Sequence, residues 1–80
     1  MSVVNKLKQY RKKVKMTQTE LAKRTGVSRQ SIYAIETQKS EPSLELAFKL
    51  SHSLGVEITD LFIWTGDGQN NDAIPTFNIF

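Results

Sequence analysis

The sequence predicts a small all-α fold of five helices, and three observations support this prediction. The chain has 80 residues, enough for one small domain, and the local contacts of helices suit a chain with so limited a core. Hydroxyl side chains that can cap a helix N-terminus precede several apolar stretches with helical spacing. Glycines that can end a helix in a left-handed turn follow two of these stretches.

Two of the predicted helices lie close together in the first half of the chain. Thr17 is the expected N-cap of the earlier one, with Glu20 three residues later to complete a capping box. Gly26 ends this helix, and Ser28 caps a second helix over residues 29–37. Because so few residues separate the two helices, they must cross steeply. This arrangement is a helix-turn-helix, whose second helix can enter a DNA major groove.

Another helix is expected before this pair, from an N-cap at Asn5 to about Val14. Leu7, Tyr10 and Val14 should form its buried face, because they lie three or four residues apart. The remainder of this helix is rich in lysine.

The fourth and fifth helices are expected in the second half of the chain. Ser43 caps the fourth, which ends at Gly55, and Thr59 caps a short fifth helix over residues 60–62. The apolar side chains of the fourth helix are Leu44, Leu46, Ala47, Phe48, Leu50 and Leu54.

We divide the chain into a helix-turn-helix domain, residues 1–62, and a C-terminal extension, residues 63–80. Short β elements are expected near the ends of the domain. Val3 and Val4 are β-branched, and the segment Ile63–Thr65 is strongly apolar, so both favour β structure.

The segment Thr76–Phe80 is open to two interpretations. One is a strand that pairs with Val3 and Val4, because Phe77 and Ile79 alternate with polar residues. The other is a disordered tail, because Pro75 and the polar run GDGQNND before it weaken regular structure.

The charged residues are distributed unevenly. Residues 1–39 contain ten Lys or Arg and two Glu, whereas residues 40–80 contain one Lys and six Asp or Glu. A basic half beside an acidic half indicates that a polyanion binds on one side only. The lysines at 12, 13 and 15 can also be read as a solvated helix face.

The composition argues against several other functions. The chain has no cysteine and one histidine, His52, so we expect no metal site and no cofactor. The sequence contains no nucleophile–base pair and no Gly-rich phosphate loop that would indicate an enzyme. We therefore assign no catalytic residue. No apolar run approaches the roughly 20 residues that cross a bilayer, and no secretory signal is visible, so a cytoplasmic protein is expected.

The motif TQTELAKRTGVSRQSIYAIETQK, followed by PSLELAFKL, resembles the phage-repressor and Cro-like family, also called the xenobiotic-response-element helix-turn-helix family. The resemblance runs from about Leu7 to Leu61. It implies a sequence-specific regulator of transcription that binds double-stranded DNA.

The expected recognition helix presents four candidate base contacts, Ser28, Arg29, Gln30 and Tyr33. Arg29 can form a bidentate contact with guanine, and Gln30 can do the same with adenine. The resemblance also makes these two positions base readers. Two alternatives stay open, since Arg29 could contact only phosphate and Tyr33 could contact phosphate or sugar.

Phosphate contacts are expected at Gln18, Lys39, Ser40 and Lys13. Gln18 lies just inside a helix N-terminus, where free N–H groups favour an anion. Lys39 and Ser40 are assigned by charge and by position in the loop after the recognition helix. Many members of the family that the chain resembles have glycine where Gln38 stands, ending the helix in a left-handed turn that is less favourable for glutamine.

The resemblance also implies a structural ion pair between Arg11 and Glu36, which would brace the first helix against the recognition helix. A bidentate contact with a carboxylate suits the arginine guanidinium group.

One recognition helix reads few base pairs, so a homodimer on a palindromic operator is expected, with the protein acting as a repressor. The candidate dimer interface consists of Phe62, Ile63, Trp64, Phe77 and Ile79. Trp64 could equally cover the core of its own chain. The alternative function is an antitoxin-like interaction protein, which would autoregulate through the same DNA-binding domain and bind a protein partner through its C-terminal extension.

Overall fold

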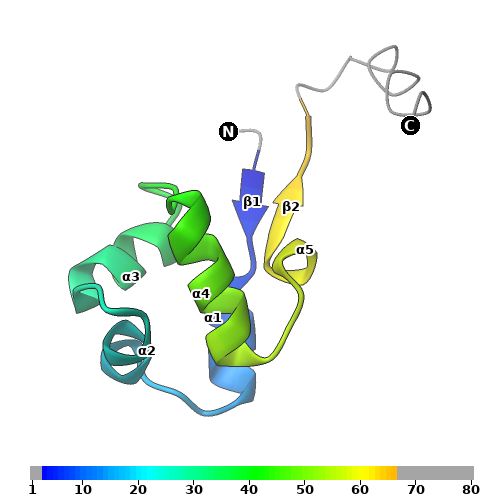
Figure 1. Ribbon diagram of the computed structural model, residues 1–80. Coiled ribbons are helices and arrows are strands. Elements are labelled where there is room, and N and C mark those ends of the chain that lie inside the picture. The colour runs from blue at the N-terminus through cyan, green and yellow to red at the C-terminus, as the bar shows by residue number, and fades with distance from the viewer. Residues whose placement is uncertain (1–2, 67–80) are drawn as a thin grey trace.

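A computed structural model describes residues 3–66 of the chain. Along the chain, five helices are preceded by one short strand and followed by another. The predicted all-α fold with a small β element is confirmed (Figure 1). In chain order the elements are β1 (Val3–Asn5), α1 (Leu7–Lys13), α2 (Gln18–Thr25), α3 (Arg29–Glu36), α4 (Leu44–Leu54), α5 (Ile58–Leu61) and β2 (Phe62–Trp64). The possible strand Thr76–Phe80, with Phe77 and Ile79, lies outside the described residues.

Short polar caps begin three of the helices, as the sequence predicts. The hydroxyl of Thr17 accepts a hydrogen bond from the backbone N–H of Glu20 at 3.0 Å. Ser28 and Ser43 cap α3 and α4 in the same way. Gly26 adopts the left-handed conformation that ends α2, with φ of 77°. The second half of the predicted capping box is replaced by an ion pair, because the Glu20 carboxylate lies 3.3 Å from the Arg24 guanidinium.

Two of the predicted helix starts are wrong by one or two residues. Asn5 belongs to β1, although its side-chain oxygen still accepts a hydrogen bond from the N–H of Leu7 at 3.1 Å. Helix α5 begins at Ile58 after an N-cap at Glu57, not at Thr59. A reciprocal hydrogen bond explains the earlier start, because the carboxylate of Asp60 accepts from the N–H of Glu57 at 3.0 Å.

The two strands pair antiparallel, with Val3 opposite Trp64 and Asn5 opposite Phe62. Strand β2 therefore starts one residue before the predicted segment 63–65. The pairing continues to the end of α5, where the N–H of Lys6 donates to the carbonyl of Leu61 at 2.8 Å. This closure joins the two ends of the domain.

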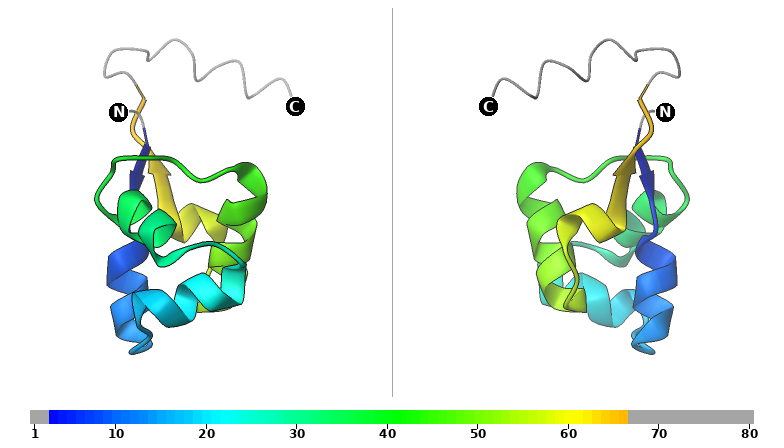
Figure 2. Two further views of the ribbon diagram at one scale, coloured as in Figure 1. Left: turned by 90° about the vertical axis from the view of Figure 1, so that its left-hand side faces the viewer. Right: turned by 90° about the vertical axis from the view of Figure 1, so that its right-hand side faces the viewer.

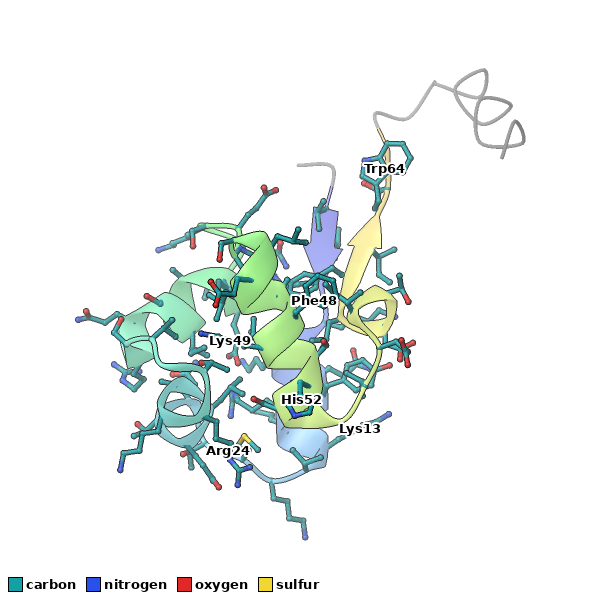
Figure 3. The ribbon with its side chains drawn as sticks, viewed as in Figure 1. Lys13, Arg24, Phe48, Lys49, His52 and Trp64 are labelled. Carbon is teal, nitrogen blue, oxygen red and sulfur yellow. The ribbon has the colours of Figure 1, made fainter. Side chains whose placement is uncertain are left out.

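The core lies where α1, α2, α3, α4 and α5 meet. Its buried side chains are Leu7, Leu21, Ala22, Ile32, Ile35, Leu50, Leu54 and Leu61. Two predicted core residues are exposed instead, Val14 at 50% and Leu44 at 72%. Val14 is the C-cap of α1 and Leu44 is the first residue of α4, so both lie at helix ends. Phe48 is also exposed and points from α4 toward the side of the molecule that carries α5 and the sheet (Figure 3).

The helix-turn-helix and the sheet lie on opposite sides of the domain. In Figure 2, α2 and α3 face the viewer in the left panel, whereas α5 and β2 face the viewer in the right panel. Within residues 3–66, no helix is both long and apolar enough to span a membrane.

Candidate nucleic-acid interface

Helix α3 buries one face and exposes the other. Ile32 and Ile35 are almost completely buried, and they hold the helix against the core. The predicted base-contacting residues, Ser28, Arg29, Gln30 and Tyr33, are all exposed. The structure therefore leaves this set of side chains accessible to a ligand on one helix face.

A buried ion pair fixes the end of α3. The Nε atom of Arg11 lies 2.6 Å from one carboxylate oxygen of Glu36, and a terminal nitrogen of Arg11 lies 3.2 Å from the other. The side chains are 9% and 2% exposed, respectively. Arg11 also donates to the carbonyl of Met16 at 2.8 Å. These contacts attach α1, the α1–α2 connection and α3 to one another.

The same carboxylate orients Gln18 at the start of α2. The amide nitrogen of Gln18 donates to Glu36 at 3.0 Å. An ionised carboxylate can only accept hydrogen bonds, so the amide oxygen of Gln18 must point away from it. That oxygen accepts a hydrogen bond from the guanidinium group of Arg29 at 2.9 Å.

Gln18 is predicted to bind a phosphate and Arg29 to bind a base, and this hydrogen bond links their side chains. Sequence reasoning did not find this contact, since the residues are eleven apart and belong to different helices. Only the crossing of α2 and α3 brings them together. A chain of hydrogen bonds thus runs from the buried ion pair through Gln18 to the exposed side chain of Arg29.

The loop after α3 keeps a left-handed turn without glycine. Gln38 has φ of 65°, a conformation that is unfavourable for a residue with a side chain. The backbone N–H groups of Lys39 and Ser40 both donate to the carbonyl of Ala34, at 2.8 and 3.3 Å. The loop is thereby attached to α3, and both predicted phosphate contacts in it are exposed.

Lys13 is not brought to this face. Its ammonium nitrogen lies 5.1 Å from the centre of the Tyr10 ring, and in Figure 3 it lies on the side of the domain away from α3. A phosphate contact at Lys13 stays a prediction without support from this placement.

The described interface candidates differ in their surroundings. Phe62 packs against the core, whereas Ile63 and Trp64 are 36% and 55% exposed. Val3 and Phe62 both line one groove. Because alternate residues of a strand lie on the same face, Trp64 and Asn5 share that face of the sheet with them. Val4 and Ile63 pair on the opposite face.

No group of three or more His, Cys, Asp or Glu side chains within residues 3–66 could hold a metal ion. His52 is exposed near the end of α4 (Figure 3).

A family model described as helix-turn-helix matches residues 7–61. The chain belongs to this family, in its phage-repressor and Cro-like form. Members of the family bind DNA and regulate transcription, and this chain is accordingly a DNA-binding regulator and not an enzyme.

Several relatives match most of their own length. An uncharacterized HTH-type transcriptional regulator of Methanocaldococcus jannaschii is 56% identical over 63 residues, covering 79% of this chain and 96% of the relative. Another, from Archaeoglobus fulgidus, is 46% identical over 59 residues, covering 74% and 83%. The similar protein YgzD of Bacillus subtilis is 36% identical over 58 residues, covering 72% and 88%.

Proposed function

We propose that this chain is a cytoplasmic, sequence-specific repressor that binds a palindromic DNA operator as a homodimer. Helix α3 enters the major groove with Arg29 and Gln30 at its leading end, and Ser28 and Tyr33 beside them. Gln18, Lys39 and Ser40 bind phosphates at the groove edges. A symmetric pair of such helices would read half-sites about 34 Å apart.

The observation that carries this proposal is the hydrogen bond between Gln18 and Arg29. Arg29 uses one N–H group on Gln18 and keeps its other N–H groups for the two acceptor atoms of a guanine. Gln18 keeps its own backbone N–H and the second hydrogen of its amide for a phosphate. This arrangement thus serves both kinds of DNA contact. Because the ion pair already orients the two side chains, they lose less conformational entropy when DNA binds.

The experiment starts from a binding site selected from random DNA at a stated salt concentration. Arg29→Ala should weaken binding to this site by about 1–3 kcal/mol and relax the preference at one base position. Arg24→Ala is a matched control, because it removes the same charge from an exposed side chain of α2 that has no place in the base-reading set. Equal losses on the selected site and on random DNA would show that Arg29 contacts only the backbone.

A homodimer through β2 is best supported at Ile63. This side chain and Val4 form an exposed apolar pair on the sheet face opposite the groove. Ile63→Ser should therefore lower the sedimenting mass from dimer to monomer. Trp64→Ala tests the other face of the same strand. A dimer that persists in both variants would remove β2 from the interface.

The antitoxin-like alternative requires a protein partner held by the C-terminal extension, most of which follows the described residues. Copurification of one specific protein with the full chain, but not with a chain that stops at Gly66, would support it.

A further inference from the structure

An open apolar groove lies between α4 and the sheet, on the side of the domain away from α3. Its volume is about 350 Å³, and one carboxylate, Glu41, stands among otherwise apolar lining residues. These are Val3, Pro42, Leu44, Ala47, Ile58 and Phe62.

Large apolar side chains near this groove face solvent. Leu44 lines the groove and is 72% exposed. Phe48, one turn further along α4, and Trp64, the strand partner of the lining residue Val3, are each 55% exposed. Figure 3 shows Phe48 directed toward the sheet side of α4 and Trp64 at the far end of β2. Exposed apolar side chains gathered around a concave surface indicate a binding partner, whereas single ones do not.

We propose that this groove binds residues 74–80 of the same chain, the segment IPTFNIF. Four of its seven residues are the apolar Ile74, Phe77, Ile79 and Phe80, and none carries a charged side chain. The groove offers the complementary surface, since its walls are almost entirely apolar. The proposal goes beyond DNA binding and does not depend on it.

The connection between groove and segment has a suitable length. Residues 67–73, DGQNNDA, separate the segment from the end of the described chain. Seven residues of extended chain span up to roughly 24 Å, whereas the strand from Phe62 to Trp64 covers about 7 Å. The connecting residues are polar and include Gly68 and two asparagines, which favour reversal of the chain direction.

The covalent connection favours binding of this segment over binding of the same segment from another copy. A short flexible connection gives an effective concentration on the order of millimolar. A second copy that is not already bound to the chain supplies its segment at micromolar concentration, about a thousand times more dilutely. We therefore expect the groove to bind the chain's own segment and not that of an unbound copy, which leaves the Val4–Ile63 face of the sheet for a second protomer.

Trp64 is the only tryptophan of the chain and stands beside the groove, so its fluorescence in the full-length protein reports occupancy. The double substitution Phe77→Ser with Ile79→Ser should shift its emission to longer wavelength and raise its quenching by acrylamide. The control, Thr76→Ala with Asn78→Ala, changes the alternate positions and should leave both signals unchanged. Wild-type fluorescence in the Phe77 and Ile79 variant would overturn the proposal.

A groove substitution tests the other side of the contact. Leu44→Ser, at a highly exposed position that should not disturb folding, should give the same spectral change. Adding Leu44→Ser to the double substitution should produce no further spectral change, because both variants disrupt the same contact between the groove and the segment. Val14→Ser removes an exposed apolar side chain at the C-cap of α1, outside the groove lining, and serves as its control. Additive changes would mean that Leu44 and the segment act separately, and would overturn the proposal.

Sedimentation distinguishes binding within the chain from exchange between copies. The fluorescence should be the same at 1 and 100 μM protein, as expected for a tether of roughly millimolar effective concentration. The Phe77 and Ile79 variant should keep the wild-type mass. Loss of a dimer in that variant would assign the segment to a second copy and overturn binding in the same chain, while DNA binding by α3 would remain a separate result.

Discussion

The helix-turn-helix side and the sheet side of this domain are stabilised in different ways. On the first side, polar side chains have specific partners, from the buried pair of Arg11 and Glu36 outward to Gln18 and Arg29. On the second side, apolar side chains surround an open groove, and Leu44 is 72% exposed. Hydrogen bonds are directional and hold one arrangement, whereas apolar surfaces accept any ligand of similar shape. The first side is thus suited to reading a fixed pattern, and the second to covering by another segment.

The largest loss of stability is expected at the buried ion pair of the helix-turn-helix side. Arg11→Met fills a similar volume but leaves the Glu36 carboxylate buried without its charged partner. We expect a loss of about 3–5 kcal/mol in the free energy of unfolding, measured with denaturant. Glu20→Ala breaks an exposed pair in the same domain and should cost no more than about 0.5 kcal/mol. A small stability loss for Arg11→Met together with abolished DNA binding would mean that Arg11 contacts DNA instead.

An intermediate effect is expected at Asn5, where the two sides meet. This β1 residue donates its amide N–H to the carbonyl of Ile35 at 2.7 Å and accepts from the N–H of Leu7. Asn5→Ala leaves both backbone groups without these partners and should cost about 1–3 kcal/mol of unfolding free energy. Asn5→Asp keeps an acceptor for Leu7 but places a carboxylate oxygen against the Ile35 carbonyl oxygen, so its loss should be at least as large. If Asn5→Ala matched the wild type in denaturant unfolding, the two sides would not be coupled through this residue.

The smallest effect concerns the loop that leads from α3 to α4. Gln38→Gly relieves a left-handed conformation but adds flexibility to the unfolded chain, so a net gain of about 0.5–1 kcal/mol is expected. Lys39 is the matched position, because it is not among the residues with positive φ. Lys39→Gly should lose roughly 0.4–1 kcal/mol, since only the entropic effect remains. Thermal or denaturant unfolding measures both changes in stability. A gain for Gln38→Gly with a loss for Lys39→Gly would establish the strain at Gln38, and changes of the same sign would contradict it.

Local chemistry accounts for the parts of the fold that could be predicted. Thr17, Ser28 and Ser43 cap helices as expected, because a cap involves atoms only two or three residues apart. The predicted positions failed where a distant contact competes with the local pattern. Asn5 was expected to begin a helix, but pairing with Phe62 places it in a strand.

The candidate site follows the same division. Helical periodicity identifies the exposed face of α3, since Ile32 and Ile35 must point inward. Periodicity carries no information on how a lysine at the end of another helix is placed, and Lys13 lies away from this face. The hydrogen bond from Arg29 to Gln18 was likewise missed, because it depends on the angle between two helices.

The helix-turn-helix, its caps, the exposed face of α3 and the family could all be predicted from the order of amino acids alone. These features depend on residue type and short spacing, which the order of amino acids specifies directly. Three features became visible only in the folded molecule. The buried ion pair extends through Gln18 to Arg29, the two ends of the domain pair as β1 and β2, and a groove opens between α4 and the sheet. Each of these joins residues from separate elements, and their distances are set by packing of the whole core.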